Sequence, residues 1–118
     1  MPKTVTIKQN SDFRRAYARG SQFTHPALIT YVSKNRAGGV RLGITASKKI
    51  GNAVTRNRAR RVIRAAYQSL EPFVKNGWYD IVFVARARTP QLKSADIARV
   101  MRRQLENAGK IQDLGCRV

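Results

Sequence analysis

The chain has 118 residues, a length that fits a single domain with one modest hydrophobic core. Its 24 lysines and arginines outnumber six acidic residues and give a formal net charge of +18, which a compact fold tolerates best when a polyanion neutralises it. This composition favours a nucleic-acid partner and excludes a membrane span, because the longest unbroken apolar run, Ile81 to Ala85, is far below the ~20 residues that a span requires.

The N-terminus and the soft metal ligands narrow the class of protein further. Residues 1–6 lack the apolar core of a signal peptide, and Cys116 has no cysteine to pair with, so we expect a cytoplasmic protein. Cys116 and His25 are the only soft ligands, which excludes zinc-based nucleic-acid modules. We therefore predict no metal site in the protein.

A short helix is predicted over residues 11–18. Asn10, Ser11 and Asp12 offer N-cap chemistry, and Phe13, Ala16 and Tyr17 recur at helical spacing. Gly20 is expected to close this helix in the left-handed conformation.

Two β-segments follow the first helix. Residues 22–33 are rich in β-branched and aromatic side chains and predict one strand, which begins near Pro26. A turn-like segment over 35–39 separates it from a second β-pattern over 40–46. Together these segments predict a hairpin.

The remaining elements complete an α-β-β-α-β-α order, which predicts an α+β sandwich. A long helix is expected over 53–70, a buried strand over 79–85 and a last helix over 94–107. The whole chain, 1–118, is predicted to form one domain, with a flexible tail over 109–118.

The long helix is predicted to be amphipathic, with a cationic outer face. At 100° per residue, its apolar residues fall within one arc of roughly 100°, which should pack on the sheet. These are Ala59, Val62, Ile63, Ala66 and Leu70. Arg58, Arg60, Arg61 and Arg64 lie outside that arc, and arginine suits RNA because its planar fork binds phosphate through two hydrogen bonds.

A run of basic residues is often no more than a solvated helix face. Such a face normally carries acids four residues from its bases, whereas the sequence has no acid between Phe13 and Leu70 and thirteen lysines and arginines there. The missing acids favour an RNA-binding face.

The segment from Ser47 to Arg64, SKKIGNAVTRNRARRVIR, resembles the signature of bacterial ribonuclease P proteins, with Arg56-Asn57-Arg58 as its core. The resemblance extends over nearly the whole chain. It implies an α+β, two-layer α/β sandwich of α-β-β-β-α-β-α type, like domain 2 of ribosomal protein S5. It also implies a left-handed βαβ crossover, although the general rule makes such connections right-handed in ~98% of cases.

The same resemblance implies two RNA-binding surfaces. One would face the catalytic RNA with Lys48, Lys49, Asn52, Arg56, Asn57, Arg58, Arg60, Arg61 and Arg64. The other would be a cleft for the 5′ leader of precursor tRNA, lined by Phe13, Tyr17, Tyr31 and Ser47. Two alternatives stay open: the three aromatic residues could be ordinary core contacts, and Ser47 and Asn52 could be only loop and helix-cap residues.

The sequence offers no catalytic residues for phosphodiester hydrolysis, because His25 stands alone and the acids are dispersed. The resemblance implies that a catalytic RNA subunit and its Mg²⁺ ions perform the cleavage, with one copy of this chain per RNA and precursor tRNA as substrate. Two other functions compete with this one: a structural ribosomal RNA-binding protein, and a nuclease that acts without RNA.

Overall fold

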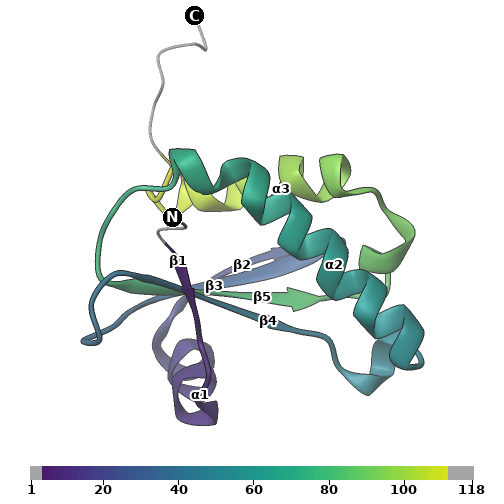
Figure 1. Cartoon of the computed structure of the whole chain (residues 1–118), viewed down its shortest axis with the longest axis horizontal. Coiled ribbons are helices and arrows are strands. Elements are labelled where there is room, and N and C mark those ends of the chain that lie inside the picture. The colour runs from purple at the N-terminus through teal and green to yellow at the C-terminus, as the bar shows by residue number, and fades with distance from the viewer. Residues whose placement is uncertain (1–3, 112–118) are drawn as a thin grey trace, which may run out of the picture.

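Five strands, three α-helices and three short 3-10 helices form within residues 4–111, the part of the chain that the computed structural model describes (Figure 1). In chain order they are β1 (Thr4–Thr6), α1 (Asn10–Arg19), β2 (Ser21–His25), β3 (Leu28–Lys34), β4 (Val40–Thr45), η1 (Lys48–Ile50), α2 (Ala53–Leu70), η2 (Glu71–Phe73), β5 (Tyr79–Ala85), η3 (Thr89–Gln91) and α3 (Ser94–Asn107). The expected α+β class is confirmed. The strand β1 was not predicted, because three residues are too few to show a periodicity.

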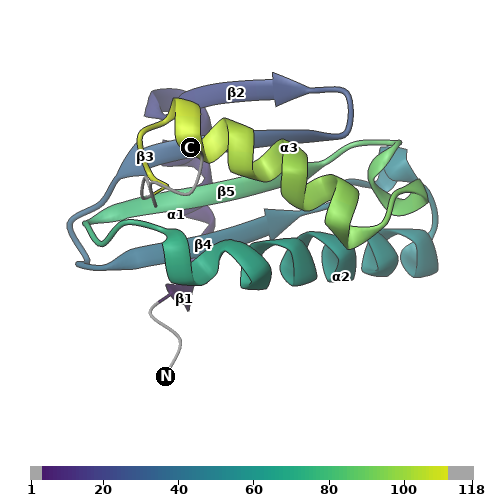
Figure 2. The same cartoon turned by 90° about the horizontal axis from the view of Figure 1, so that it is seen from above.

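The strand β5 lies at the centre of a sheet with the order β1-β4-β5-β3-β2 (Figure 2). It pairs antiparallel with β3 and parallel with β4. All its residues except Val84 are buried, since a central strand is covered on both faces. The predicted hairpin between residues 22–33 and 40–46 is wrong, because β5 separates β3 from β4.

The hairpin forms instead inside the stretch that was predicted as one strand. There β2 and β3 pair in antiparallel fashion, with His25 opposite Leu28. Pro26 cannot donate to a strand ladder, and the Ala27 N–H donates to Nδ1 of His25 at 3.0 Å. A two-residue turn at Pro26 and Ala27 therefore divides the segment.

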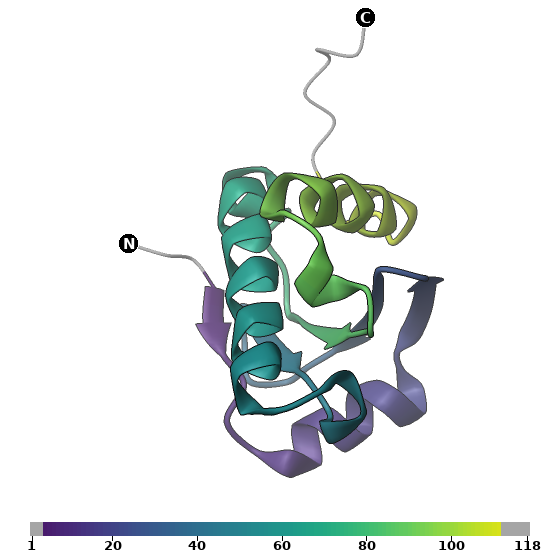
Figure 3. The same cartoon turned by 90° about the vertical axis from the view of Figure 1, so that its right-hand side faces the viewer.

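The parallel strands β4 and β5 are joined by a left-handed crossover. Figure 2 views the sheet from the side of α2, with both strands running from left to right and β5 above β4. A right-handed connection would place β5 below β4 in this view, and Figure 3 gives the same hand from the end of the strands. The handedness expected from the family resemblance is confirmed.

Helices cover both faces of the sheet. The main core lies under α2 and α3, whereas α1 packs on the opposite face over a smaller cluster of Ile7, Ala16 and Val82 (Figure 3). The inner face of α2 is largely as predicted, with Val62 only half-buried and Tyr67 added to the buried set. The buried residues of α2 are Ala59, Ile63, Ala66, Tyr67 and Leu70.

The ends of α1 differ from the prediction. Its N-cap is Gln9, without a capping side-chain bond, and Asp12 is buried. Gly20 ends the helix in an extended conformation with φ −75°, not in the left-handed region. A Cβ at Gly20 would lie 2.5 Å from the Ala16 carbonyl oxygen, so glycine is needed here for close backbone approach.

A buried ionic network fixes α1 to the sheet. Nε and Nη2 of Arg41 each donate to one carboxylate oxygen of Asp80 at 2.8 Å, and Nδ2 of Asn35 donates to Asp80 at 2.7 Å. Nη2 of Arg41 also lies 3.2 Å from Oδ1 of Asp12. The hydrogen bonds to Asp80, with those to Asp12, raise the pKa of Arg41 further above its ordinary value. Asp12 therefore faces inward and anchors α1.

The first three residues of the predicted tail belong to the fold. The Lys75 N–H donates to the Lys110 carbonyl at 2.8 Å, and Ile111 forms an isolated bridge with Val74. The rest of that tail, residues 112–118, lies outside the described residues. Among the helices of residues 4–111, none is long and apolar enough to span a bilayer.

Candidate RNA-binding surfaces

The helix α2 begins at a well-defined cap. Oδ1 of Asn52 accepts a hydrogen bond from the Thr55 N–H at 2.9 Å, as an N-cap residue does. Gly51, with φ 152°, turns the chain from η1 into this cap. Asn52 is thus the N-cap of α2, and the exposed Lys48 and Lys49 of η1 stand beside the start of the helix.

Among residues 4–111, the cations on the outer face of α2 have no acidic partners. Arg58, Arg61 and Arg64 are exposed, together with Asn57. Within residues 4–111, every ion pair of an aspartate or glutamate is made with an arginine outside α2: Arg15, Arg41, Arg99 or Arg102. The prediction of a cationic face without acids of its own is confirmed for this part of the chain.

Three of the five arginines of α2 are constrained by their surroundings, and two of these, Arg58 and Arg60, are among the four that the helical wheel placed on the open face. Nε of Arg58 donates to the Pro90 carbonyl at 2.8 Å, so this side chain also holds η3 against α2. Arg56 is half-buried, and its Nε has no hydrogen-bond partner in the described part of the chain. Arg60 is also half-buried and donates to Oδ1 of Asn57 at 3.0 Å. Long side chains can follow a packed surface in this way while their charged ends stay near water.

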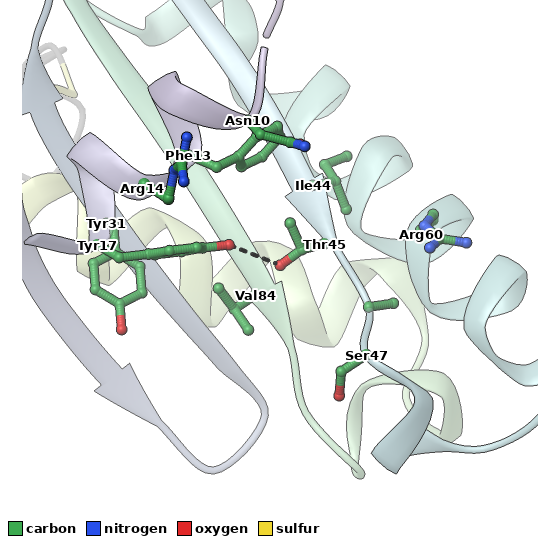
Figure 4. A pocket seen from close by; sticks show the side chains of 11 residues that line it. Asn10, Phe13, Arg14, Tyr17, Tyr31, Ile44, Thr45, Ser47, Arg60 and Val84 are labelled. Atoms are coloured by element: carbon green, nitrogen blue, oxygen red, sulfur yellow. Dashed lines mark hydrogen bonds between the residues drawn. The ribbon is translucent and has the colours of Figure 1, made fainter. Parts of the chain in front are cut away.

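A groove of about 890 Å³ runs between α1 and the sheet, on the face opposite α3 (Figure 4). All four residues of the predicted cleft, Phe13, Tyr17, Tyr31 and Ser47, line it. The sequence did not predict seven further lining residues. These are Asn10, Arg14, Ile44, Thr45, Ala46, Arg60 and Val84, of which Arg60 had been assigned to the other surface.

The aromatic residues of the groove are both packed and accessible. Tyr17 and Tyr31 meet edge to face, with ring centroids 5.0 Å apart and planes at 71°. Tyr17 is 42% exposed, and its hydroxyl lies 3.4 Å from Oγ1 of Thr45 (Figure 4). Phe13 and Tyr31 are half-buried against the small core under α1. The core-contact alternative therefore holds in part for Phe13 and Tyr31, while Tyr17 belongs to the surface.

Gly43 makes room for Phe13. A Cβ at Gly43 would lie 2.5 Å from Cε1 of Phe13, which is closer than any real contact. The ring can therefore settle on β4 only because this position carries no side chain. No local pattern predicted this contact, which joins residues 30 positions apart.

Basic side chains flank the groove, and no acid lines it among the described residues. Arg14 stands on α1 at one side and Arg60 on α2 at the other (Figure 4). Arg14 could have been found from the sequence, because it lies three residues before Tyr17 and shares its helix face. An aromatic floor between cations is the arrangement that binds unpaired nucleic acid.

The family model of ribonuclease P matches residues 1–109. The chain belongs to the ribonuclease P protein family. The ribonuclease P protein component of Clostridioides difficile is 43% identical over 96 residues, which cover 80% of this chain and 83% of that protein. The component of Clostridium botulinum is 39% identical over 108 residues, covering 91% of this chain and 96% of that protein.

Solved structures of ribonuclease P proteins share this fold. The protein from Staphylococcus aureus superposes with a TM-score of 0.77 at 30% identity, covering 91% of this chain and 97% of that chain. The protein from Thermotoga maritima, at 21% identity, supports the fold alone, with a TM-score of 0.74 over 86% of this chain and 96% of that chain.

Proposed function

We propose that this chain is the RNA-binding subunit of ribonuclease P and that it grips the 5′ leader of precursor tRNA while the catalytic RNA cleaves. The groove carries this proposal, because it brings Phe13, Tyr17, Tyr31 and Ser47 together at one surface. Aromatic rings stack on unpaired bases for ~1–3 kcal/mol each, whatever the base, which suits leaders of variable sequence.

The second surface faces the catalytic RNA. It consists of the exposed Lys48, Lys49, Arg58, Arg61 and Arg64 with Asn57, and it is supported by the absence of acidic partners along α2. Asn52 at the cap of α2 and the half-buried Arg56 in its first turn belong to this surface, and Arg60 reaches from α2 to the groove. Arg60 therefore joins the two surfaces, so that the leader lies beside the catalytic RNA.

The chemistry belongs to the RNA and its Mg²⁺ ions. Within residues 4–111, no three histidine, cysteine, aspartate or glutamate side chains gather closely enough to hold a metal ion. The described residues thus do not fit a catalytic metal site, and we assign the metal to RNA phosphates. One chain per RNA would place one leader groove beside one cleavage site, and its positive charge would offset the repulsion between the two RNA backbones.

Reconstitution with a bacterial ribonuclease P RNA tests the proposal. At low Mg²⁺ the chain should raise the single-turnover cleavage of precursor tRNA, and purified chain alone should cleave nothing. A chain that bound this RNA without changing leader removal would contradict the proposal, as would cleavage by the chain without RNA.

The Tyr17→Ala variant tests the groove. We expect the affinity of the holoenzyme for precursor tRNA to fall about 5- to 100-fold, while the affinity for mature tRNA is unchanged. Tyr17→Phe is the matched control, because it keeps the ring and removes only a hydroxyl with a long 3.4 Å contact. An equal loss of affinity for both tRNAs would refute the assignment of Tyr17 to the leader groove. A loss of thermal stability without the selective loss of affinity for precursor tRNA would refute it as well.

A further inference from the structure

Trp78, the only tryptophan of the chain, lies at the surface just before β5 and is 66% exposed. Its position is nevertheless defined. The Trp78 carbonyl accepts a hydrogen bond from the Asn35 N–H at 3.0 Å. Its indole lies against the turn at Gly38, where a Cβ would be 3.6 Å from Cε2. The ring is thus held in place and open to solvent.

Three lysines share a surface depression with Trp78. Lys34, Lys75, Asn76 and Lys110 line one shallow depression of about 340 Å³ together with Trp78, and we call this set the Trp78 surface. Among the described residues, no aspartate or glutamate lines the depression. Lys34 also lines a neighbouring depression with Arg15, Arg19 and Arg36, so the positive surface continues toward α1.

The backbone beneath the lysines is ordered. The Lys75 N–H donates to the Lys110 carbonyl at 2.8 Å, and the Tyr79 hydroxyl donates to the Lys75 carbonyl. Nζ of Lys110 lies 4.6 Å above the Tyr79 ring. Binding at this surface therefore needs little ordering of the backbone, which favours affinity.

The Trp78 surface is separate from the leader groove. Along the paired strands, Thr45 at the groove is opposite Val84, whereas Val40 is opposite Tyr79, beside Trp78. Five residues of strand, or about 17 Å, separate these positions, and the nearer end of the groove, where Tyr31 is opposite Val82, lies three residues or about 10 Å from Tyr79. In Figure 2 the start of β5 and the end of α3 lie at the left, whereas the end of β4, which lines the groove, lies further to the right.

We propose that the Trp78 surface binds a second, unpaired segment of RNA, with a base stacked on Trp78 and phosphates held by the lysines. The inference rests on the proposed function, which supplies RNA as the partner, and adds a contact distant from both surfaces assigned above. An exposed indole among cations without acids is suited to single-stranded nucleic acid, because stacking tolerates any base and the lysines track the backbone.

Trp78 is also the probe for this proposal, since its emission is the only tryptophan signal of the chain. Titration of the free protein with a pentauridylate oligonucleotide at low salt should quench this emission to saturation. Pyrophosphate supplies the charge without a base and should leave the emission unchanged. Anionic phospholipid vesicles should leave the wavelength of maximal emission unchanged. A shift to shorter wavelength with vesicles, without quenching by the oligonucleotide, would assign the surface to a membrane and overturn the proposal.

Variants separate this surface from the groove. Lys75→Gln should weaken the binding of the oligonucleotide, as measured by the quenching of Trp78. It should also lower the slope of log K against log salt by about 0.7, which is the contribution of one phosphate contact for a single strand. Arg103→Gln, which removes one exposed cation from α3, is the charge-matched control and should change neither the affinity for the oligonucleotide nor this slope. Tyr17→Ala should leave the quenching intact. Quenching that Tyr17→Ala abolishes would place the oligonucleotide in the groove and overturn the proposal.

Trp78→Ala, measured by the anisotropy of a labelled RNA, identifies the natural partner. An affinity loss of about 5- to 100-fold for the catalytic RNA alone would place the unpaired segment there, and the same loss only for precursor tRNA would place it on the substrate. Unchanged affinity for both RNAs would refute the inference, even where Tyr17→Ala confirms the leader groove.

Discussion

Neutralising two arginines of α2 tests the surface assigned to the catalytic RNA. Arg61 and Arg64 are the cleanest pair, because both are exposed and neither has a hydrogen bond or ion pair among the described residues. Arg58 is less suitable, since its bond to the Pro90 carbonyl would be lost as well. Arg61→Gln combined with Arg64→Gln should therefore leave the thermal unfolding temperature unchanged.

The expected effect is on the salt dependence of RNA binding. Each phosphate contact contributes about 0.7 to 0.9 to the slope of log K against log salt, so the double variant should lower that slope by about 1.4 to 1.8. When the salt concentration rises from 50 to 200 mM, both proteins should lose affinity for ribonuclease P RNA. The factor by which the affinity falls should be roughly ten times smaller for the double variant than for the unaltered chain. Filter binding across this range of salt measures both quantities.

A charge-matched double variant on α3 provides the control. Arg102→Gln with Arg103→Gln removes the same charge from a helix to which we assign no RNA contact, and it should shift the slope little. An equal change of slope in the α3 variant would show that the α2 arginines act only through net charge. An unchanged slope in the α2 variant would show that α2 does not face the RNA.

Three further predictions concern stability. Arg41→Ala leaves Asp80 buried without its main partner and should cost ~3–5 kcal/mol in urea unfolding, whereas a loss below ~1 kcal/mol would mean that water replaces the guanidinium. Gly43→Ala should displace Phe13, cost ~1–3 kcal/mol and weaken precursor tRNA binding, and full stability with full binding would refute the contact. Burial raises the pKa of Tyr67 to about 12, above ~10 in the unfolded chain, so its contribution to stability is complete below pH ~10 and is lost as the pH rises toward 12. Above pH ~10, Tyr67 should lower the free energy of unfolding by at most ~1.4 kcal/mol per pH unit. The urea midpoint of Tyr67→Phe should therefore decline less steeply with pH than that of the unaltered chain, and an equal decline in both proteins would exclude Tyr67 as the cause.

Local patterns accounted for much of the candidate site. The spacing of Phe13 and Tyr17 placed both rings on one short helix, and the groove contains both. The structure added Arg14, which the same spacing could have predicted, and Thr45, which it could not. Thr45 reaches the groove because β4 ends beneath α1, and no local pattern reports where a strand ends relative to a distant helix.

The sequence by itself determined the character of each segment. The bounds of α2, its buried face and its uncompensated arginines follow from the period of 3.6 residues and from composition, which are local properties. Only the tertiary structure decided which segments are neighbours. It placed β5 between β3 and β4, turned Asp12 inward to Arg41, fitted Phe13 over Gly43 and brought Trp78 beside Lys110. These contacts join residues far apart in the chain, and they depend on how whole faces pack together, which the order of side chains along one segment does not record.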